Sequence, residues 1–146
     1  MSKEKLPEFV TEDENNISLS FDFSDVEEPH VITSDEAEQI EIIAASVGTK
    51  ESTGNSYYAL TFESVSDPFA KVFKHWIMLP KEGLDAKEAN NRKLRLREFY
   101  EAIGFDYTRE HSASDLIGLT CWALLRVEDD PTYGEQNKVR RFVTSN

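Results

Sequence analysis

The sequence has little of what many functional sites are built from. Its 146 residues include one cysteine and three histidines. One cysteine cannot close an internal disulfide, and histidines at positions 30, 75 and 111 do not build a metal site around Cys121. No hydrophobic run approaches the roughly 18 residues of a membrane-spanning helix, and the amino terminus lacks the apolar core of a signal peptide. These absences predict a soluble cytoplasmic protein without a metal or other cofactor.

Basic residues are also scarce. The chain has 16 lysines and arginines against 28 acidic residues, which gives a net charge of −12. That charge argues against a protein that covers phosphates with its whole surface, but it leaves room for a local basic face. The length fits one domain of ordinary size, so multi-domain organisations are excluded.

The negative charge is concentrated at the amino end. Residues 1–36 hold two lysines and 11 acidic residues, a net charge of −9, while residues 37–146 have a net charge of −3. Apolar residues in 1–36 follow no sustained period, so we predict a mostly flexible acidic arm before a folded domain at 37–146. Phenylalanines among acids in the stretch SLSFDFSDVEE leave three interpretations open. The arm is a solvated tail, a segment that docks on a partner or masks the domain itself, or a segment with a short strand.

From Ala37 onward the pattern changes to strands with one helix. Asp85 can cap a helix that we predict from about Ala86 to Ile103, before Gly104. The third predicted strand follows Asp67-Pro68 and ends at Pro80. The predicted strands are EQIEIIAASV, SYYALTFESV, AKVFKHWIML, LIGLTCWALLRV and EQNKVRRFV.

This order, β-β-β-α-β-β, predicts a mainly β fold with one helix. It matches the layout of an OB-fold-like, five-stranded Greek-key barrel, in which the second and third strands bind oligonucleotides or oligosaccharides. Another small barrel or an α+β sandwich stays open. In the fourth strand, alternation predicts that one face enters the core, and its members are Ile117, Leu119, Cys121, Ala123, Leu125 and Val127.

The sequence carries no recognisable catalytic signature, so we predict that the protein is not an enzyme. Glu128, Asp129 and Asp130 are interpreted as a solvated hairpin tip, and His75 as a structural side chain. The basic run between Arg92 and Arg97 is interpreted as a solvated helix face.

Binding of single-stranded nucleic acid requires aromatic rings on which bases stack and cations that follow the phosphates. The predicted strands interleave both residue types. Alternation leaves open which side of the third strand faces inward, but only one side places a lysine beside a large ring. If Trp122 packed under the helix, or if Tyr57 covered an end of the barrel, that residue would instead belong to the core. The candidate binding residues are Lys50, Tyr57, Lys74, Trp76, Trp122, Arg126, Lys138 and Arg140.

The stretches NRKLRLREFYEAIGF, LIGLTCWALLRVEDDPTYGEQNKVRRF and TGNSYYALTF resemble small phage-encoded proteins of replication and recombination modules. The likeness covers roughly residues 40–144. The matching positions are Ala102, Ile103 and Gly104 at the helix end, Leu116, Ile117 and Gly118 before the fourth strand, and Tyr133, Gly134, Asn137, Lys138 and Val139 before and within the fifth. The resemblance implies an OB-like, single-stranded DNA-binding protein. Related single-strand binders usually carry their acidic tail at the carboxyl end, whereas here the acidic segment lies at the amino end.

We therefore predict a sequence-independent single-stranded DNA-binding protein of phage type, acting in DNA replication or recombination. Its acidic arm is a candidate docking segment for phage or host replication and recombination proteins, and self-association stays open. The alternative is a non-enzymatic interaction or assembly module that binds protein through its barrel and arm.

Overall fold

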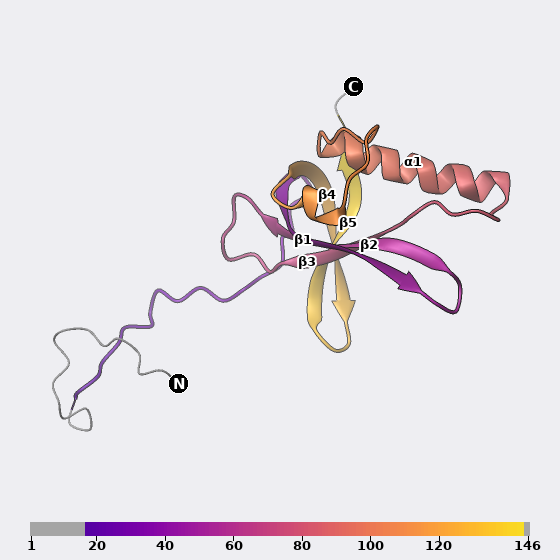
Figure 1. Ribbon diagram of the computed structural model, residues 1–146. Helices are drawn as coiled ribbons and strands as arrows, with labels where there is room; N and C mark the ends of the chain where they lie inside the picture. The colour runs from indigo at the N-terminus through magenta and orange to yellow at the C-terminus, as the bar shows by residue number, and fades with distance from the viewer. Residues whose placement is uncertain (1–16, 145–146) are drawn as a thin grey trace.

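The computed structural model describes residues 17–144 and has five antiparallel strands in one sheet with one α-helix beside it (Figure 1). The predicted mainly β composition and the order of elements are confirmed. A short 3-10 helix, η2, precedes the fourth strand. The elements are β1 (Glu38–Lys50), β2 (Asn55–Ser64), β3 (Phe73–Met78), α1 (Ala86–Ala102), η2 (Ala113–Leu116), β4 (Thr120–Asp130) and β5 (Gly134–Val143).

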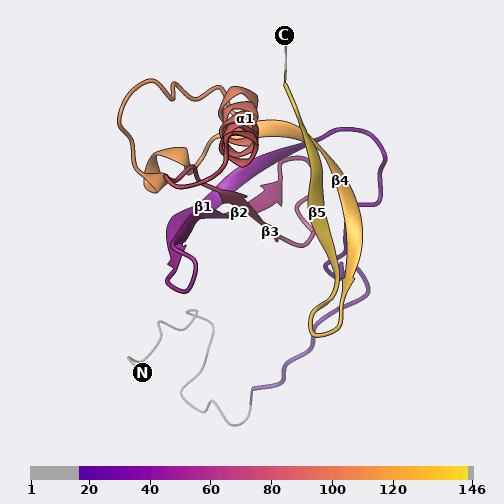
Figure 2. The same cartoon turned by 90° about the vertical axis from the view of Figure 1, so that its right-hand side faces the viewer.

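The strands lie in the order β3-β2-β1-β4-β5, and each neighbouring pair is antiparallel. The sheet is strongly curved, with α1 lying across one end (Figure 2). No ladder joins β3 to β5 within the described residues, so the sheet is open. The two edge strands meet through side chains instead, with the rings of His75 and Phe142 5.3 Å apart between centroids.

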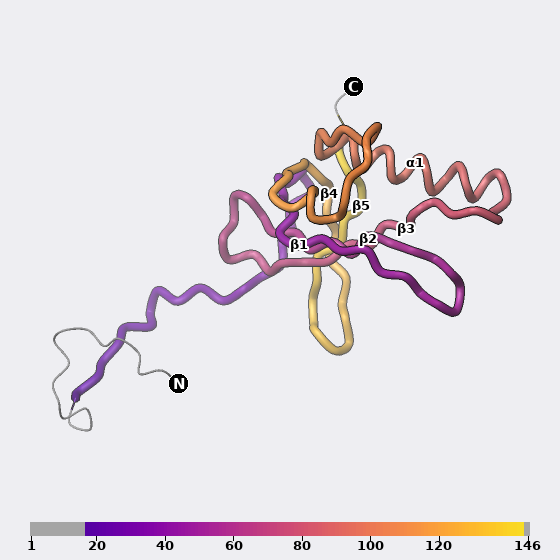
Figure 3. The backbone as a smooth tube through the Cα atoms, in the orientation of Figure 1, coloured from indigo at the N-terminus to yellow at the C-terminus, as the bar shows by residue number. Residues whose placement is uncertain are grey.

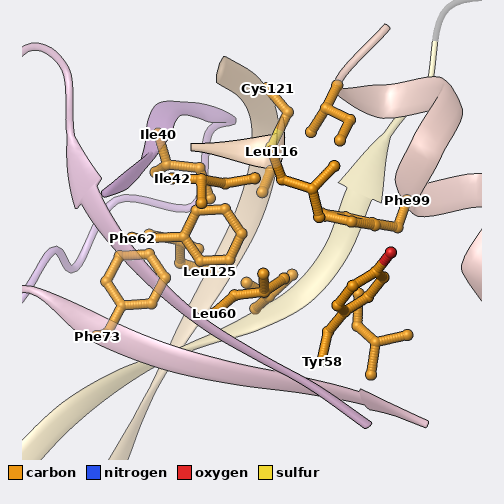
Figure 4. Packing of buried hydrophobic residues seen from close by; sticks show 14 of the residues in the cluster. Ile40, Ile42, Tyr58, Leu60, Phe62, Phe73, Phe99, Leu116, Cys121 and Leu125 are labelled. Carbon is orange, nitrogen blue, oxygen red and sulfur yellow. The ribbon is translucent and has the colours of Figure 1, made fainter. Parts of the chain in front are cut away.

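The core fills the inner face of the curved sheet (Figure 4). Alternation along β2 turns Tyr58, Leu60 and Phe62 inward, where they are buried. In β3 the buried residues are Phe73 and Ile77. Lys74, Trp76 and Met78 therefore lie on the outer face, which answers the question that alternation alone left open for this strand.

Helix α1 begins at Ala86 as predicted and ends at Ala102, one residue before the predicted end. The Asp85 side chain accepts a hydrogen bond from the backbone N–H of Glu88 at 2.8 Å, and Ile103 caps the other end. The helix buries Phe99 and Tyr100 against the sheet. Within the described chain, no helix combines the length and apolar character needed to cross a membrane.

Arg92 corrects the interpretation of the basic run as a solvated helix face. Its side chain is only 10% exposed and pairs with Glu88. It also donates to the Leu79 carbonyl and to Asn55 Oδ1, both at 3.2 Å. Arg92 thus ties α1 to the end of β3 and the start of β2, because a guanidinium offers five donors in a fixed geometry.

The prediction for the fourth strand was wrong at both ends. Leu116 belongs to η2, and β4 begins only at Thr120. Gly118, at a φ of 94°, turns the chain and breaks the alternation, so Ile117 is exposed rather than in the core. Val127 is also exposed, because it lies toward the tip of the β4–β5 hairpin, which extends beyond the core (Figure 3). The middle of the predicted core face is buried as expected.

The described part of the predicted arm contacts the domain before the boundary at Glu36. The backbone of His30 exchanges hydrogen bonds with Phe69 and Lys71, which precede β3. Ile32 is buried in the core, and its N–H and C=O bond to the side chain of Asn137 in β5. Residues 30–32 therefore bridge the two edges of the open sheet. The first 16 residues of the predicted arm lie outside the described residues.

Replacing Asn137 should destabilise this bridge. The side chain is 1% exposed, and its bonds to Ile32 are 2.8 and 2.9 Å long. In Asn137→Leu these backbone groups lose their partner, so we expect a loss of about 1–3 kcal/mol in the free energy of unfolding, measured in urea. Asn90→Leu, at an exposed position of α1, is the control and should lose nothing. Equal stabilities of both variants would show that Asn137 does not hold the segment.

Candidate nucleic-acid interface

A groove follows the open side of the sheet, between α1, β3 and β5. Its volume is about 830 Å³. The apolar lining includes Trp76 and Met78 from β3 and Leu94 from α1. Five arginines and two glutamates also line it, in a chain that is acidic overall. The arginines are Arg92, Arg95, Arg126, Arg140 and Arg141.

Trp76 is the aromatic platform of this groove. It lies on the outer face of β3, and its side chain is half-exposed. The Lys138 ammonium lies 5.3 Å from the ring centroid, a cation–π contact that reaches from β5 across the gap. The residue opposite Trp76 on β2 is Ala59, which is too small to cover the indole. An exposed ring with a cation beside it is what stacking on a base and contact with its phosphate require.

A β-bulge in β5 brings two consecutive arginines to the groove. The register shifts between Leu124 and Leu125 of β4, so Arg141 pairs with Leu124 and Val139 with Leu125. Arg140 is the extra residue between them. Both Arg140 and Arg141 line the groove, although strict alternation would place them on opposite faces.

Most of these arginines have no acidic partner within the described residues. Arg126 pairs with Glu128 and also donates to the Val139 carbonyl at 3.3 Å. Among residues 17–144, by contrast, Arg95, Arg140 and Arg141 have no carboxylate within ion-pair distance. Three exposed guanidiniums around Trp76 are therefore available to an anion.

His75 adds no charge to the groove near neutral pH. Its ring is half-buried against Phe142. Burial, together with the charges of Lys138 and Arg126, lowers the pKa of His75 to about 4. The imidazole is thus neutral at pH 7 and forms part of the groove floor.

Two further candidates lie on the same outer surface as Trp76. Lys74 is exposed two residues before it on β3. Tyr57 lies on β2 opposite Met78, and its ring covers Gly48, where an added Cβ would meet ring atoms at 2.6 Å. Tyr57 therefore packs on β1 with part of its surface and stays half-exposed on the outer face, outside the core.

The structure does not bring the other two candidates to the groove. Trp122 lies on β4, where it pairs with Gln39 of β1 and Val143 of β5. It is as exposed as Trp76, but it is not among the lining residues. Lys50 ends β1, and its carbonyl accepts hydrogen bonds from the turn at Thr53 and Gly54.

Sequence reasoning missed Arg95 and Arg141. Arg95 was assigned to a solvated face, but the way α1 packs against the sheet turns it toward the groove. Arg141 was left out because alternation pairs Lys138 with Arg140. The two adjacent arginines in the fifth strand could have indicated a β-bulge, because two adjacent side chains of a strand reach the same side only at an irregularity.

Within the described residues, no group of three or more histidine, cysteine or acidic side chains could hold a metal ion. The chain matches no protein-family model and no curated protein. The case for a function therefore depends on the geometry and charge of the groove.

Proposed function

We propose that the protein binds single-stranded DNA in the groove between α1, β3 and β5, without dependence on sequence. The observation that carries this proposal is the half-exposed Trp76 in a groove lined by arginines that have no acidic partner among residues 17–144. A base stacks on the indole, and the flanking phosphates meet Arg95, Arg140 and Arg141. Stacking and phosphate contacts are available to every base, which makes such binding tolerant of sequence.

The fold proposed with this function is an OB-fold-like barrel. The strand order supports it, because β1 pairs with both β2 and β4 while β3 and β5 face each other across the gap. In this interpretation side-chain contacts and residues 30–32 complete the barrel in place of a β3–β5 ladder. The proposed role is protection of exposed strands during phage DNA replication or recombination.

The two tryptophans offer a matched test. Trp76 and Trp122 are each 50% exposed, and only Trp76 lines the groove. We expect Trp76→Ala to weaken binding of oligo-dT by about 1–3 kcal/mol, the contribution of one stacked base. Trp122→Ala removes the same side chain elsewhere and should bind like the parent. Titrations by fluorescence anisotropy of a labelled oligonucleotide measure both. A larger loss in Trp122→Ala would place the interface on β4, away from the groove.

Tryptophan emission gives a second measurement from the same pair. The chain has only these two tryptophans, so Trp122→Phe leaves Trp76 as the sole emitter, and Trp76→Phe leaves Trp122. Stacked bases should quench Trp76 and leave Trp122 unchanged. Quenching of neither residue, with oligo-dT present at saturation, would contradict the proposed interface.

A protein-binding module remains the second candidate, because a separate cleft has exposed apolar side chains. It has a volume of about 530 Å³ and lies between the loop before β3, the β4–β5 hairpin and the amino-terminal segment. Phe69, Val72 and Tyr133 line it and are largely exposed. If oligo-dT does not bind at low salt, this cleft becomes the better candidate.

A further inference from the structure

The arm segment, residues 17–28, has apolar side chains that are exposed and do not enter the core of the domain. It runs away from the sheet in an extended path (Figures 1 and 3). Leu19, Phe21, Phe23 and Val26 are 60–72% exposed, and the rings of Phe21 and Phe23 lie against each other, with centroids 6.2 Å apart. Large apolar side chains exposed together on a short segment indicate a binding element.

The same segment is acidic from Asp22 onward. Its charged residues are Asp22, Asp25, Glu27 and Glu28, with no lysine or arginine among them. Phenylalanines and carboxylates thus alternate along an extended chain, much as bases and phosphates alternate along a single DNA strand. The groove has complementary features in Trp76 and in Arg95, Arg140 and Arg141, which have no carboxylate partner in the described part of the chain.

The arm segment is anchored beside that groove. Ile32 is held by Asn137, and the next residue of β5, Lys138, lies over the Trp76 ring. Arg140 follows three residues after Asn137, about 10 Å along the strand. His30 is also held, by its backbone bonds to Phe69 and Lys71, so the free chain from His30 back to Phe23 is seven residues and spans up to roughly 25 Å when extended. Trp76 lies six residues after Ala70, the bridge partner of His30, which is about 20 Å along the chain. Both phenylalanines can therefore reach Trp76 within one molecule.

We propose that the arm segment of each molecule occupies its own groove and competes there with the DNA strand. This inference rests on the proposed function for the identity of the competitor. Phe21 or Phe23 lies on the Trp76 ring, and the carboxylates meet the three arginines. The extended position of the arm segment in the structure is then the state in which the groove is free to bind DNA. A short tether gives the segment an effective concentration of about millimolar, so weak contacts are enough to occupy the site.

A spin label on the arm segment tests this in the full chain. Ser24→Cys carries a nitroxide, which quenches a nearby indole, and Trp122→Phe leaves Trp76 as the only emitter. The single native thiol does not compete for the label, because Cys121 is buried and burial raises its pKa to about 12. We expect Trp76 to be quenched at low salt and to recover at about 1 M salt, where the Debye length is about 3 Å.

The control variants separate local contact from net charge. One replaces the four arm acids with amides, as Asp22→Asn, Asp25→Asn, Glu27→Gln and Glu28→Gln. The other makes the same charge change at exposed acids outside the groove, as Glu51→Gln, Glu82→Gln, Glu110→Gln and Asp129→Asn. We expect the first set to abolish quenching and to tighten oligo-dT binding about tenfold at about 0.01 M salt, where charges act over about 30 Å. The second set should change both much less.

Each result has one meaning. Unquenched Trp76 emission at low salt overturns the proposal. Quenching that grows with protein concentration also overturns it, because the arm segment in the groove would then belong to a second copy of the chain. Oligo-dT that binds without releasing the label overturns the competition and leaves DNA binding intact. If the arm quenches Trp76 but the protein binds no DNA, the arm segment still binds the groove, and it is the proposed function that is contradicted.

Discussion

The variant Arg95→Ala/Arg140→Ala/Arg141→Ala is expected to bind oligo-dT about 100-fold more weakly at about 0.1 M salt, since each phosphate contact to a single strand contributes about 0.7 to the salt slope. The slope of log affinity against log salt should fall by about 2 for the same reason. These side chains line the groove without a carboxylate partner among the described residues, so their removal costs phosphate contacts and breaks no ion pair there. Anisotropy titrations across a salt series measure both quantities.

A control of equal charge distinguishes contact from general electrostatics. Lys93→Ala/Arg97→Ala/Arg109→Ala also removes three exposed cations, none of which lines the groove. Non-local attraction is screened at moderate salt, because the Debye length is about 10 Å at 0.1 M. We therefore expect this variant to keep most of its affinity and nearly the full slope. Similar losses in both triple variants would show that net charge, and not the groove, governs binding.

Phe99→Ala should cause the largest loss of stability, about 3–5 kcal/mol in the free energy of unfolding. The ring is fully buried and joins α1 to the sheet, with centroids 5.4 Å from Phe142 and 6.3 Å from Tyr58. Truncation leaves a cavity between helix and sheet that those rings cannot fill without moving. Urea unfolding, followed by far-UV circular dichroism, measures the change.

Leu94→Ala on the same helix is the matched control. Leu94 is another large apolar residue of α1, but it is 39% exposed and lines the groove. Surface substitutions usually change stability by less than about 0.5 kcal/mol, so we expect little change. If Phe99→Ala costs no more than Leu94→Ala, helix α1 does not depend on Phe99 for its attachment to the sheet.

Most of the local structure could be predicted from residue patterns. Helix α1 begins after Asp85 as predicted and ends at Ala102, one residue before the predicted end, because capping and helical spacing are local properties. The five strands were found for the same reason, since alternation and turn residues act over a few positions. The prediction failed at Leu116 and Ile117, where a short 3-10 helix and the turn at Gly118 interrupt an apolar run that reads as one strand.

The candidate site was harder to predict, because it combines distant segments. Sequence alone named Trp76, Arg126, Lys138 and Arg140, which belong to three strands. It could not separate Trp76 from Trp122, since both are large rings on outward positions of apolar strands and are equally exposed. Only the curvature of the sheet, which brings β3 beside β5, distinguishes them.

Short-range chemistry along the chain was thus sufficient to predict the helix and strands. It also showed the acidic character of the amino end and the residue types suited to binding a strand of DNA. The groove itself follows from three long-range arrangements. These are the approach of the sheet edges, the packing of α1 that turns Arg95 inward, and the bulge at Arg140 that adds Arg141. The anchoring of Ile32 by Asn137 joins positions 105 residues apart. Such contacts depend on how whole elements pack, and a pattern with a period of two or 3.6 residues contains no information about partners that far along the chain.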